Sequence, residues 1–311
     1  MPKAVLPLAI VHEHPQWFLP LFAALDRRGL PWTAVRLQDH VFELDEAEPP
    51  ARLVFNRLAM SAFLRQREHP LYYAQALYAH WESRGAEVIN GGPALAIDLS
   101  KARQLSLIRS LGLGLPRTRV IHRAADAVRA AEGLRFPLLV KANIGGAGAG
   151  IVRFDSPAAL SEAAGADALP RSVDGVLLVQ EYVPARDRQV IRVETLAGRY
   201  LYALALNSDS GSFDLCPADV CLTDKPRLTV AAHRASDEVI AEVEAIARAA
   251  GLDVGGVEYV VDDRDGIRRY FDINALSNFV ARPLDVLGFD PHERLIDYLQ
   301  QRMAGAAARS R

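Results

Sequence analysis

The stretch from Phe136 to Phe154 constrains this chain more than any other. It reads as a buried apolar strand that ends near Lys141, a glycine-rich loop and a second strand. Glycine lets backbone N–H groups approach an anion, because it has no Cβ and tolerates positive φ. Lys141 adds a positive charge that can reach phosphate oxygens. The stretch therefore predicts a nucleotide phosphate site or, as the simpler alternative, a flexible hairpin with a solvated lysine.

The order of the lysine and the glycines narrows the first interpretation. In the P-loop the lysine follows the glycines and opens a helix, whereas Lys141 precedes them. The glycines stand at Gly145, Gly146, Gly148 and Gly150, which does not give the Gly-x-Gly-x-x-Gly spacing of dinucleotide sites. Both common phosphate motifs are therefore excluded.

Composition limits the class of protein. The 311 residues predict two or three domains, and half of them are hydrophobic. A net charge of −2 without a basic run argues against nucleic acid as a partner. The first apolar stretch, residues 4–11, is far shorter than the roughly 20 residues that span a bilayer, so we expect no membrane segment. Two cysteines, Cys216 and Cys221, cannot form a disulfide framework, and we expect a cytoplasmic protein.

The order of predicted elements indicates an α/β chain with α+β lobes. Residues 1–95 alternate strands with helices, which predicts a parallel sheet. We expect a central lobe at 96–175, which carries the glycine-rich loop, and a C-terminal lobe at 176–304. Small and basic residues at 305–311 predict a frayed tail.

A set of oxygen ligands stands on the last predicted hairpin. Asp272 and Asn274 are two apart on a strand and share a face, and Glu258 on the preceding strand can lie beside them. Two carboxylates and an amide oxygen suit Mg²⁺, which takes few protein ligands and completes its shell with phosphate and water. A polar solvent face is the alternative, but the apolar neighbours of these residues favour the metal site.

A second segment is typical of adenine binding. The run Gln-Glu-Tyr-Val at 180–183 ends an apolar strand, where an extended backbone can pair with the edge of a base. Asp187 follows closely and could accept ribose hydroxyls.

Taken in order, these motifs resemble the ATP-grasp superfamily, in its RimK-like branch of amino-acid ligases. The resemblance covers residues 4 to about 300 and is specific because the motifs keep their order and spacing. The motifs are Asn90, Lys101 at a helix start, Pro-Arg-Thr at 116–118, Lys141 with its loop, the run 180–183, Arg192, Gly-Val-Glu-Tyr at 256–259 and Phe-Asp-Ile-Asn at 271–274.

The resemblance implies that ATP lies between two lobes. Lys101 and Lys141 would contact the phosphates, and the loop 144–150 would close over them. Glu181, Tyr182 and Val183 would form the adenine hinge. Arg192 would face the γ-phosphate or the acyl substrate as a catalytic residue. Glu258, Asp272 and Asn274 would hold one or two Mg²⁺ or Mn²⁺ ions.

The implied reaction joins small carboxylate and amine substrates, such as amino acids or a peptide. The carboxylate attacks ATP to give an acyl phosphate and ADP, and an amine then displaces phosphate. Relatives are often homodimers or homotetramers. A non-catalytic ATP-binding protein and a phosphotransferase remain alternatives.

The sequence departs from the family at two positions. Val190 replaces an acidic residue two before Arg192, so Asp187 is our candidate for the ribose contact. Asp214 stands where relatives carry an arginine, which would suit a cationic or neutral substrate better than an anion. Two further segments could touch the acceptor substrate or serve structural roles, namely His12-Glu13-His14 and Asn56-Arg57.

Overall fold

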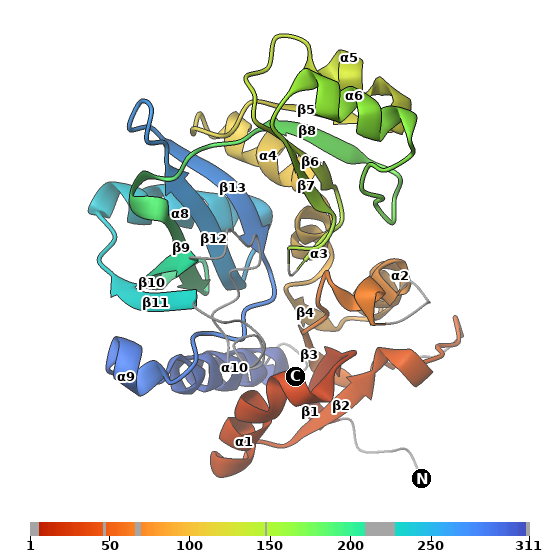
Figure 1. Cartoon of the computed structure of the whole chain (residues 1–311). Helices are drawn as coiled ribbons and strands as arrows, with labels where there is room; N and C mark the ends of the chain where they lie inside the picture. The colour runs from red at the N-terminus through yellow and green to blue at the C-terminus, as the bar shows by residue number, and fades with distance from the viewer. Residues whose placement is uncertain (1–5, 46–47, 66–69, 147, 209–227, 309–311) are drawn as a thin grey trace.

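The computed structural model describes residues 6–45, 48–65, 70–146, 148–208 and 228–308. Its strands form three sheets, which Figure 1 shows as the N-terminal sheet at the bottom, the central sheet at the top and the C-terminal sheet on the left. The candidate site lies where the central sheet and the C-terminal sheet approach each other (Figure 1).

The N-terminal sheet is parallel, as the alternating pattern predicts. Its strands follow the order β2-β1-β3-β4. Alternate residues of β1 face opposite sides of the sheet. Leu8 and Ile10 pack with α1 and α10, and Ala9 and Val11 pack with α2 and α3. A strand covered on both faces explains the continuous apolar run in the sequence. The elements are β1 (Leu6–His12), α1 (Leu19–Arg27), β2 (Trp32–Arg36), β3 (Ala51–Asn56), α2 (Pro70–Ser83), β4 (Glu87–Ile89) and α3 (Gly92–Asp98).

The central sheet is antiparallel and has the order β5-β8-β6-β7. One face packs on α5 and α6 through residues such as Leu138 and Leu160. The strand β8 lies in this sheet, so the central lobe extends through Glu181 and beyond the boundary that we expected at residue 176. The elements are β5 (Thr118–Ile121), α5 (Ala127–Ala131), β6 (Leu138–Ala142), β7 (Ile151–Phe154), α6 (Pro157–Gly165) and β8 (Leu177–Glu181).

The C-terminal sheet is also antiparallel, with the order β11-β10-β9-β12-β13. One face buries α8 and α4 against Val257 and Ile273. Ser236 caps α8 and Gly251 ends it at φ +65°. The elements are α4 (Lys101–Ser110), β9 (Gln189–Leu196), β10 (Arg199–Ser208), β11 (Leu228–His233), α8 (Asp237–Ala250), β12 (Val254–Val261) and β13 (Arg268–Asn274).

The last helix, α10 (Pro291–Ala308), returns to the N-terminal sheet. Leu295, Ile296 and Leu299 pack with β1 and β3. The helix continues through Ala308, so the first residues of the tail that we predicted at 305–311 are helical. The shorter elements are α9 (Pro283–Leu287) and the 3₁₀ turns η1 (Pro15–Phe18), η2 (Leu37–Asp39), η3 (Ala62–Leu64), η4 (Ala124–Asp126) and η5 (Arg186–Arg188).

Asn90 joins the N-terminal sheet to the C-terminal hairpin. This fully buried residue donates through Nδ2 to the carbonyls of Val254 (2.6 Å) and Ala275 (2.7 Å). Its Oδ1 accepts from the backbone N–H groups of Asp253 (2.8 Å) and Val254 (3.1 Å). The motif asparagine therefore positions the strands β12 and β13, which carry the candidate metal ligands.

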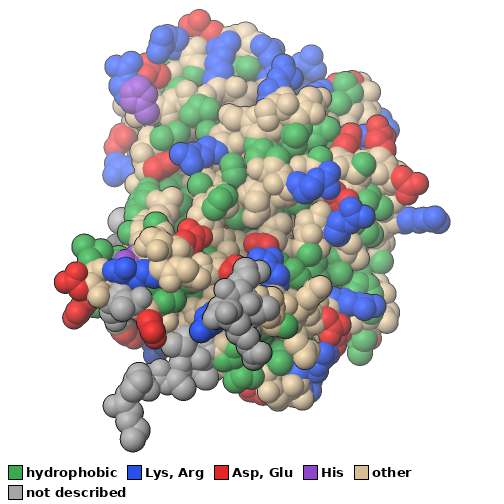
Figure 2. Space-filling view, turned by 180° about the vertical axis from the view of Figure 1, so that it is seen from behind, with side chains coloured by type: hydrophobic (Ala, Val, Ile, Leu, Met, Phe, Trp, Pro, Cys, Tyr) green, Lys and Arg blue, Asp and Glu red, His purple; other side chains and the backbone are tan. Residues whose placement is uncertain are grey.

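The surface carries mixed charge. Figure 2, a view from behind, shows Lys and Arg side chains interspersed with Asp and Glu over most of that face. This distribution agrees with the small net charge of the chain.

Candidate active site

A row of charged side chains crosses the C-terminal sheet. Arg192 on β9, Glu258 on β12 and Asp272 on β13 are directly opposite one another in the strand register. Residues next to them in the sequence, such as Val257, pack against α8. The charged row therefore occupies the other face of the sheet. The structure therefore brings Glu258 and Asp272 together as the hairpin pattern predicts.

A second row lies beside the first on the same face. It contains Glu194, Gly256 and Asn274, again directly opposite one another. A Cβ at position 256 would lie 2.8 to 3.0 Å from the Arg192 guanidinium, so only glycine leaves room for that side chain. The Nδ2 of Asn274 is buried and has no hydrogen-bond partner among the described residues.

A β-bulge re-aims the end of β13. The register shifts between Glu258 and Tyr259, so that Phe271 is an extra residue on β13. Bulges disrupt a ladder locally and redirect side chains. The Lys141 Nζ lies 5.7 Å from the centre of the Phe271 ring, and Asp272 contacts Lys101. The bulge thus accompanies two successive residues that both face the lysines.

Lys101 is the first residue of α4. The Ser100 side chain caps this helix by accepting from the Arg103 N–H. The Lys101 Nζ donates to the Asp272 Oδ1 at 2.5 Å. Burial opposes the charge of Lys101, but Asp272 and the neighbouring carboxylates outweigh it and raise its pKa.

Lys141 lies on β6 and is 8% exposed. Burial, followed by the charge of Lys101, lowers the pKa of Lys141 to about 8. An anion between the two lysines would relieve this repulsion. Both predicted phosphate contacts therefore face the hairpin that carries the predicted metal ligands.

Two amide side chains, which the sequence reasoning missed, fix these lysines in place. The Asn143 Oδ1 accepts from the Ala102 N–H at 2.9 Å and ties the end of β6 to α4. Gln104 exchanges two hydrogen bonds with the Ile273 backbone, at 2.8 and 3.1 Å. Asp98 was also missed: this residue ends α3, and burial raises its pKa to about 7. The sequence signal for Asp98 was an acid between the apolar residues Ile97 and Leu99.

Arg192 is held by two carboxylates. Its Nε donates to Glu194 at 2.6 Å and its Nη1 to Glu258 at 2.8 Å. Burial opposes its charge, but Glu194 and Glu258 outweigh burial and raise the pKa of Arg192. The guanidinium is therefore a fixed positive charge beside the metal ligands.

The donor set fits a small hard cation. Burial and the charge of Asp272 raise the pKa of Glu258, so a nearby positive charge would favour its ionised form. Among the described residues, Arg192 donates to Oε1 of Glu258 and Lys101 to Oδ1 of Asp272, which leaves the second oxygen of each carboxylate for another ligand. No group of three or more His, Cys, Asp or Glu suited to a metal occurs in the described residues. Two carboxylates and an amide suit Mg²⁺, whose remaining ligands are water and phosphate.

The glycine-rich loop connects β6 and β7 and reaches the N-terminal domain. Gly148 and Gly150 adopt φ of +70° and +72°, which only glycine adopts without strain. A Cβ at Gly146 would lie 3.0 Å from the Ser61 Cβ. Ile144 is buried in the core that contains Leu58 and Met60. The loop thus lies against the N-terminal domain.

The side chain of the hinge residue Glu181 points away from Lys141. Glu181 is opposite Leu138 and Lys141 is opposite Leu178, so Glu181 and Lys141 point to opposite faces of the central sheet. The Glu181 carboxylate accepts from the Arg135 N–H at 2.9 Å and pairs with Arg117 at 3.4 Å. A nucleotide contact from Glu181 would therefore use its backbone.

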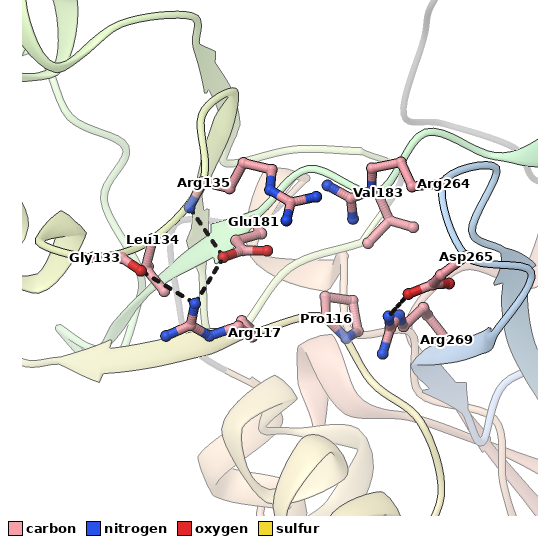
Figure 3. A pocket seen from close by; sticks show the side chains of 10 residues that line it. All are labelled: Pro116, Arg117, Gly133, Leu134, Arg135, Glu181, Val183, Arg264, Asp265 and Arg269. Atoms are coloured by element: carbon pink, nitrogen blue, oxygen red, sulfur yellow. Dashed lines mark hydrogen bonds and ion pairs between the residues drawn. The ribbon is translucent and has the colours of Figure 1, made fainter.

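A cavity of about 470 Å³ lies behind this hinge. Figure 3 shows the Glu181 carboxylate facing Arg117 and the backbone of Arg135 within it. The lining residues are Pro116, Arg117, Gly133, Leu134, Arg135, Glu181, Val183, Arg264, Asp265 and Arg269. The predicted hinge residues Glu181 and Val183 line the cavity, and neither predicted phosphate-binding lysine does.

The other residues considered for nucleotide binding follow Glu181 in the chain. The Arg153 guanidinium covers the Tyr182 ring at 4.6 Å. Asp187 is exposed on the turn η5 at φ +55°. Val190 packs in an apolar cluster, opposite Leu206 on β10. The predicted ribose role of Asp187 stays a prediction.

The two segments that we considered for the acceptor substrate, residues 12–14 and 56–57, lie where β1 and β3 end, at the carboxyl edge of the parallel sheet. Glu13 is buried and forms an ion pair with Arg65. Arg57, also buried, follows β3. Asp214, Cys216 and Cys221 lie outside the described residues.

Comparison with known proteins identifies the family. A family model for the RimK-like ATP-grasp domain matches residues 98–279. A probable alpha-L-glutamate ligase of Teredinibacter turnerae is 27% identical over 46% of this chain and 46% of its own length. A probable alpha-L-glutamate ligase of Picosynechococcus sp. is 26% identical over 75% of this chain and 73% of its own length. The chain thus spans about half the length of the first relative.

The fold has a matching solved structure. The ATP-grasp ligase PsnB, in complex with a minimal precursor, superposes with a TM-score of 0.68 at 20% identity, over 95% of this chain and 99% of that one. This likeness confirms the expected fold. Among the described residues, no helix is long and apolar enough to cross a membrane. The family model matches more than half of the chain and confirms the resemblance seen in the sequence: the chain belongs to the RimK-like ATP-grasp family.

Proposed function

We propose that this chain is an ATP-dependent ligase that activates a carboxylate as an acyl phosphate and joins it to an amine, with release of ADP and phosphate. The observation that carries this proposal is the contact between Lys101 and Asp272. It joins the cationic first residue of α4 to a carboxylate of the C-terminal sheet, beside Glu258 and Lys141, which lies on the central sheet. Phosphoryl transfer needs such charges around the reacting group and little covalent help.

Each group has a distinct role in this proposal. Lys101 and Lys141 bind phosphate oxygens, and Arg192 holds a fixed charge near the acyl group. Glu258, Asp272 and Asn274 would hold one or two Mg²⁺ or Mn²⁺ ions. Such an ion supplies positive charge that stabilises the transferring phosphoryl group.

The loop at 144–150 excludes water in this proposal. An acyl phosphate hydrolyses readily, so the site must be closed while the amine attacks. The burial of Ile144 against the N-terminal domain supports this role.

We infer that the substrates are a small carboxylate and an amine, because the relatives above are named as glutamate ligases. A reaction that consumes ATP also favours a cytoplasmic protein. Assembly as a homodimer or homotetramer stays a prediction, which light scattering of the purified protein tests.

Release of ADP tests the proposal. The purified protein receives ATP, Mg²⁺ and a pool of amino acids and amines, and the products are analysed by mass. We expect ADP together with a new amide, and we expect Lys141→Ala and Asp272→Ala to lose both. A phosphorylated hydroxyl compound would indicate a phosphotransferase, and ATP binding without ADP release would indicate a non-catalytic protein.

A further inference from the structure

A buried carboxylate in the second row is only half satisfied. Glu194 is fully buried, and its Oε1 accepts from the Arg192 Nε at 2.6 Å. Its Oε2 has no hydrogen-bond partner among the described residues. A buried carboxylate oxygen without a partner is unfavourable, because it loses its hydration and gains no hydrogen bond in return. Such an atom indicates a site for a donor from outside the chain.

A buried arginine approaches the same place from the N-terminal domain. Arg57 follows β3 and is 2% exposed. Its Nη2 donates to the Ser277 carbonyl and to the Asn278 Oδ1. Its guanidinium lies over the rings of Phe18 and Phe55, at 5.2 and 5.0 Å from their centres. Its Nε and Nη1 have no hydrogen-bond partner in the part of the chain that the structure describes. Burial lowers the pKa of Arg57 to about 9, and Glu194 opposes this shift.

The segment after β13 brings the two groups to one locality. Tyr202 lies opposite Glu194 on the neighbouring strand. The Tyr202 ring is 6.3 Å from the Phe279 ring, centre to centre. Phe279 directly follows the residues that accept from Arg57. Arg57 and Glu194 therefore border the same region from two sheets, and no ion pair joins them within the described residues.

The two side chains suit a ligand that carries one negative and one positive charge. The unpartnered N–H groups of Arg57 suit a carboxylate, and the Oε2 of Glu194 suits an ammonium. One molecule that carries both charges satisfies both side chains. An α-amino acid is the smallest such molecule, whereas the amino group of a peptide terminus would leave Arg57 unpartnered.

The position of Glu194 decides which end of the ligand reacts. Its row is adjacent to the row of Arg192, Glu258 and Asp272, two residues along each strand, or about 7 Å. An ammonium on Glu194 is therefore close to the phosphoryl-transfer groups. The carboxylate on Arg57 is held away from them, toward the N-terminal domain.

We propose that Arg57 and Glu194 bind a free α-amino acid as the amine substrate, Arg57 holding its carboxylate and Glu194 its ammonium. This inference rests on the proposed ligase function. Both side chains act in recognition and positioning. Because they belong to different sheets, entry of the amino acid requires these sheets to move apart.

The experiment first separates activation from amine recognition. Hydroxylamine replaces the amine substrate and traps an acyl phosphate as a hydroxamate. Because hydroxylamine has no carboxylate, this reaction does not depend on recognition of an amino acid by Arg57. Wild-type protein is given ATP, Mg²⁺ and a panel of amino acids as carboxylate donors. Hydroxamate with ADP supports the proposed function, and the absence of both would overturn that function together with this inference.

The second arm compares amine substrates. The best carboxylate donor from the panel is held fixed, and each amino acid is then tested as the amine beside its carboxamide and its N-acetyl derivative. We expect the wild type to prefer the free amino acid over the carboxamide on the order of 100-fold in kcat/KM, with no turnover of the N-acetyl compound. Equal turnover of amino acid and carboxamide, with hydroxamate still formed, would overturn this inference alone.

Variants then assign the preference to Arg57. Arg57→Met should reduce the preference to about onefold, whereas Arg57→Lys, which keeps the charge, should retain part of it. A purely structural role of Arg57 would lower both values of kcat/KM equally and leave their ratio unchanged, which would overturn the assignment. Arg302→Met is the matched control, since Arg302 is a partly buried arginine that pairs with Glu87 and Asp253, and its ratio should equal that of the wild type. If Arg57→Met fails to fold, an Arg57→Lys ratio identical to the wild type together with an unchanged ratio in Glu194→Gln would contradict the proposal.

Discussion

Lys101 and Asp272 meet at 2.5 Å, although they are 171 positions apart in the chain. The contact joins the first residue of α4 to the bulged end of β13, and both side chains are largely buried. Asp272 thereby neutralises Lys101, as a phosphate would, and Lys101 neutralises Asp272, as a metal cation would. We infer that nucleotide binding exchanges this ion pair for contacts of Lys101 with phosphate and of Asp272 with the metal.

Replacement of Asp272 by Asn tests this exchange. The variant keeps the shape but removes the charge that would attract a cation. We expect kcat/KM for ATP to fall by about 100-fold or more, because charge at the phosphoryl group is a large catalytic term, and half-saturation by Mg²⁺ to move to higher concentration. ADP release measured across a series of Mg²⁺ concentrations checks both. Asp263→Asn, an exposed acid on the turn of the same hairpin, is the control and should behave as the wild type.

The sequence sufficed to find the residues whose signals are local. Lys141 stands between an apolar strand and glycines, and Asp272 alternates with apolar residues on one strand. Both patterns depend on chemistry within a few positions. The capping of α4 by Ser100 is equally local and places Lys101 at the start of its helix.

The supporting contacts could not be predicted in this way. Gln104 contacts Ile273 at a separation of 169 residues, and no local pattern encodes that pair. The direction of the Glu181 side chain depends on strand register, because a shift of one residue moves a side chain to the other face. The bulge at Phe271 likewise depends on pairing with β12.

Lys141 predicts a pH dependence. Its pKa is lowered to about 8, so Nζ is charged below this pH and neutral above it. Contacts with phosphate need the charge, and kcat/KM for ATP should therefore fall as the pH rises through about 8. Because kcat/KM reports the free enzyme, a pH profile of ADP release measures this group. Lys141→Arg keeps its charge throughout and should lack this fall, and a profile identical to the wild type would contradict the assignment.

The contact between Gly146 and Ser61 predicts a defect in closure. A methyl group at position 146 would lie 3.0 Å from the Ser61 Cβ, which is closer than normal packing allows. We expect Gly146→Ala to hold the loop away from the N-terminal domain, so that water hydrolyses part of the acyl phosphate. The ratio of ADP to amide should then rise above one.

The partner residue supplies the control for this prediction. Ser61→Gly removes the Cβ that the new methyl group meets at 3.0 Å and leaves the Ser61 backbone nitrogen at 3.1 Å, so the double variant should recover part of the wild-type ratio. Gly165→Ala, where a Cβ meets nothing within 4 Å, should leave the ratio unchanged. A ratio of one in Gly146→Ala would show that this contact does not govern closure.

Asn90 predicts a loss of stability. Its side chain satisfies two buried carbonyls and two backbone N–H groups near the start of β12 and the end of β13. Asn90→Ala leaves these groups unpaired and should lower the free energy of unfolding by about 3 kcal/mol. Its φ of +52° adds strain for alanine but not for glycine. Calorimetry should therefore show a lower Tm for both variants, with Asn90→Gly less affected by about 1 kcal/mol. Asn90→Asp separates donor from acceptor, because it keeps an acceptor for the N–H groups but sets a carboxylate oxygen against two carbonyls. A wild-type Tm for Asn90→Asp would mean that the donated hydrogen bonds do not stabilise this junction.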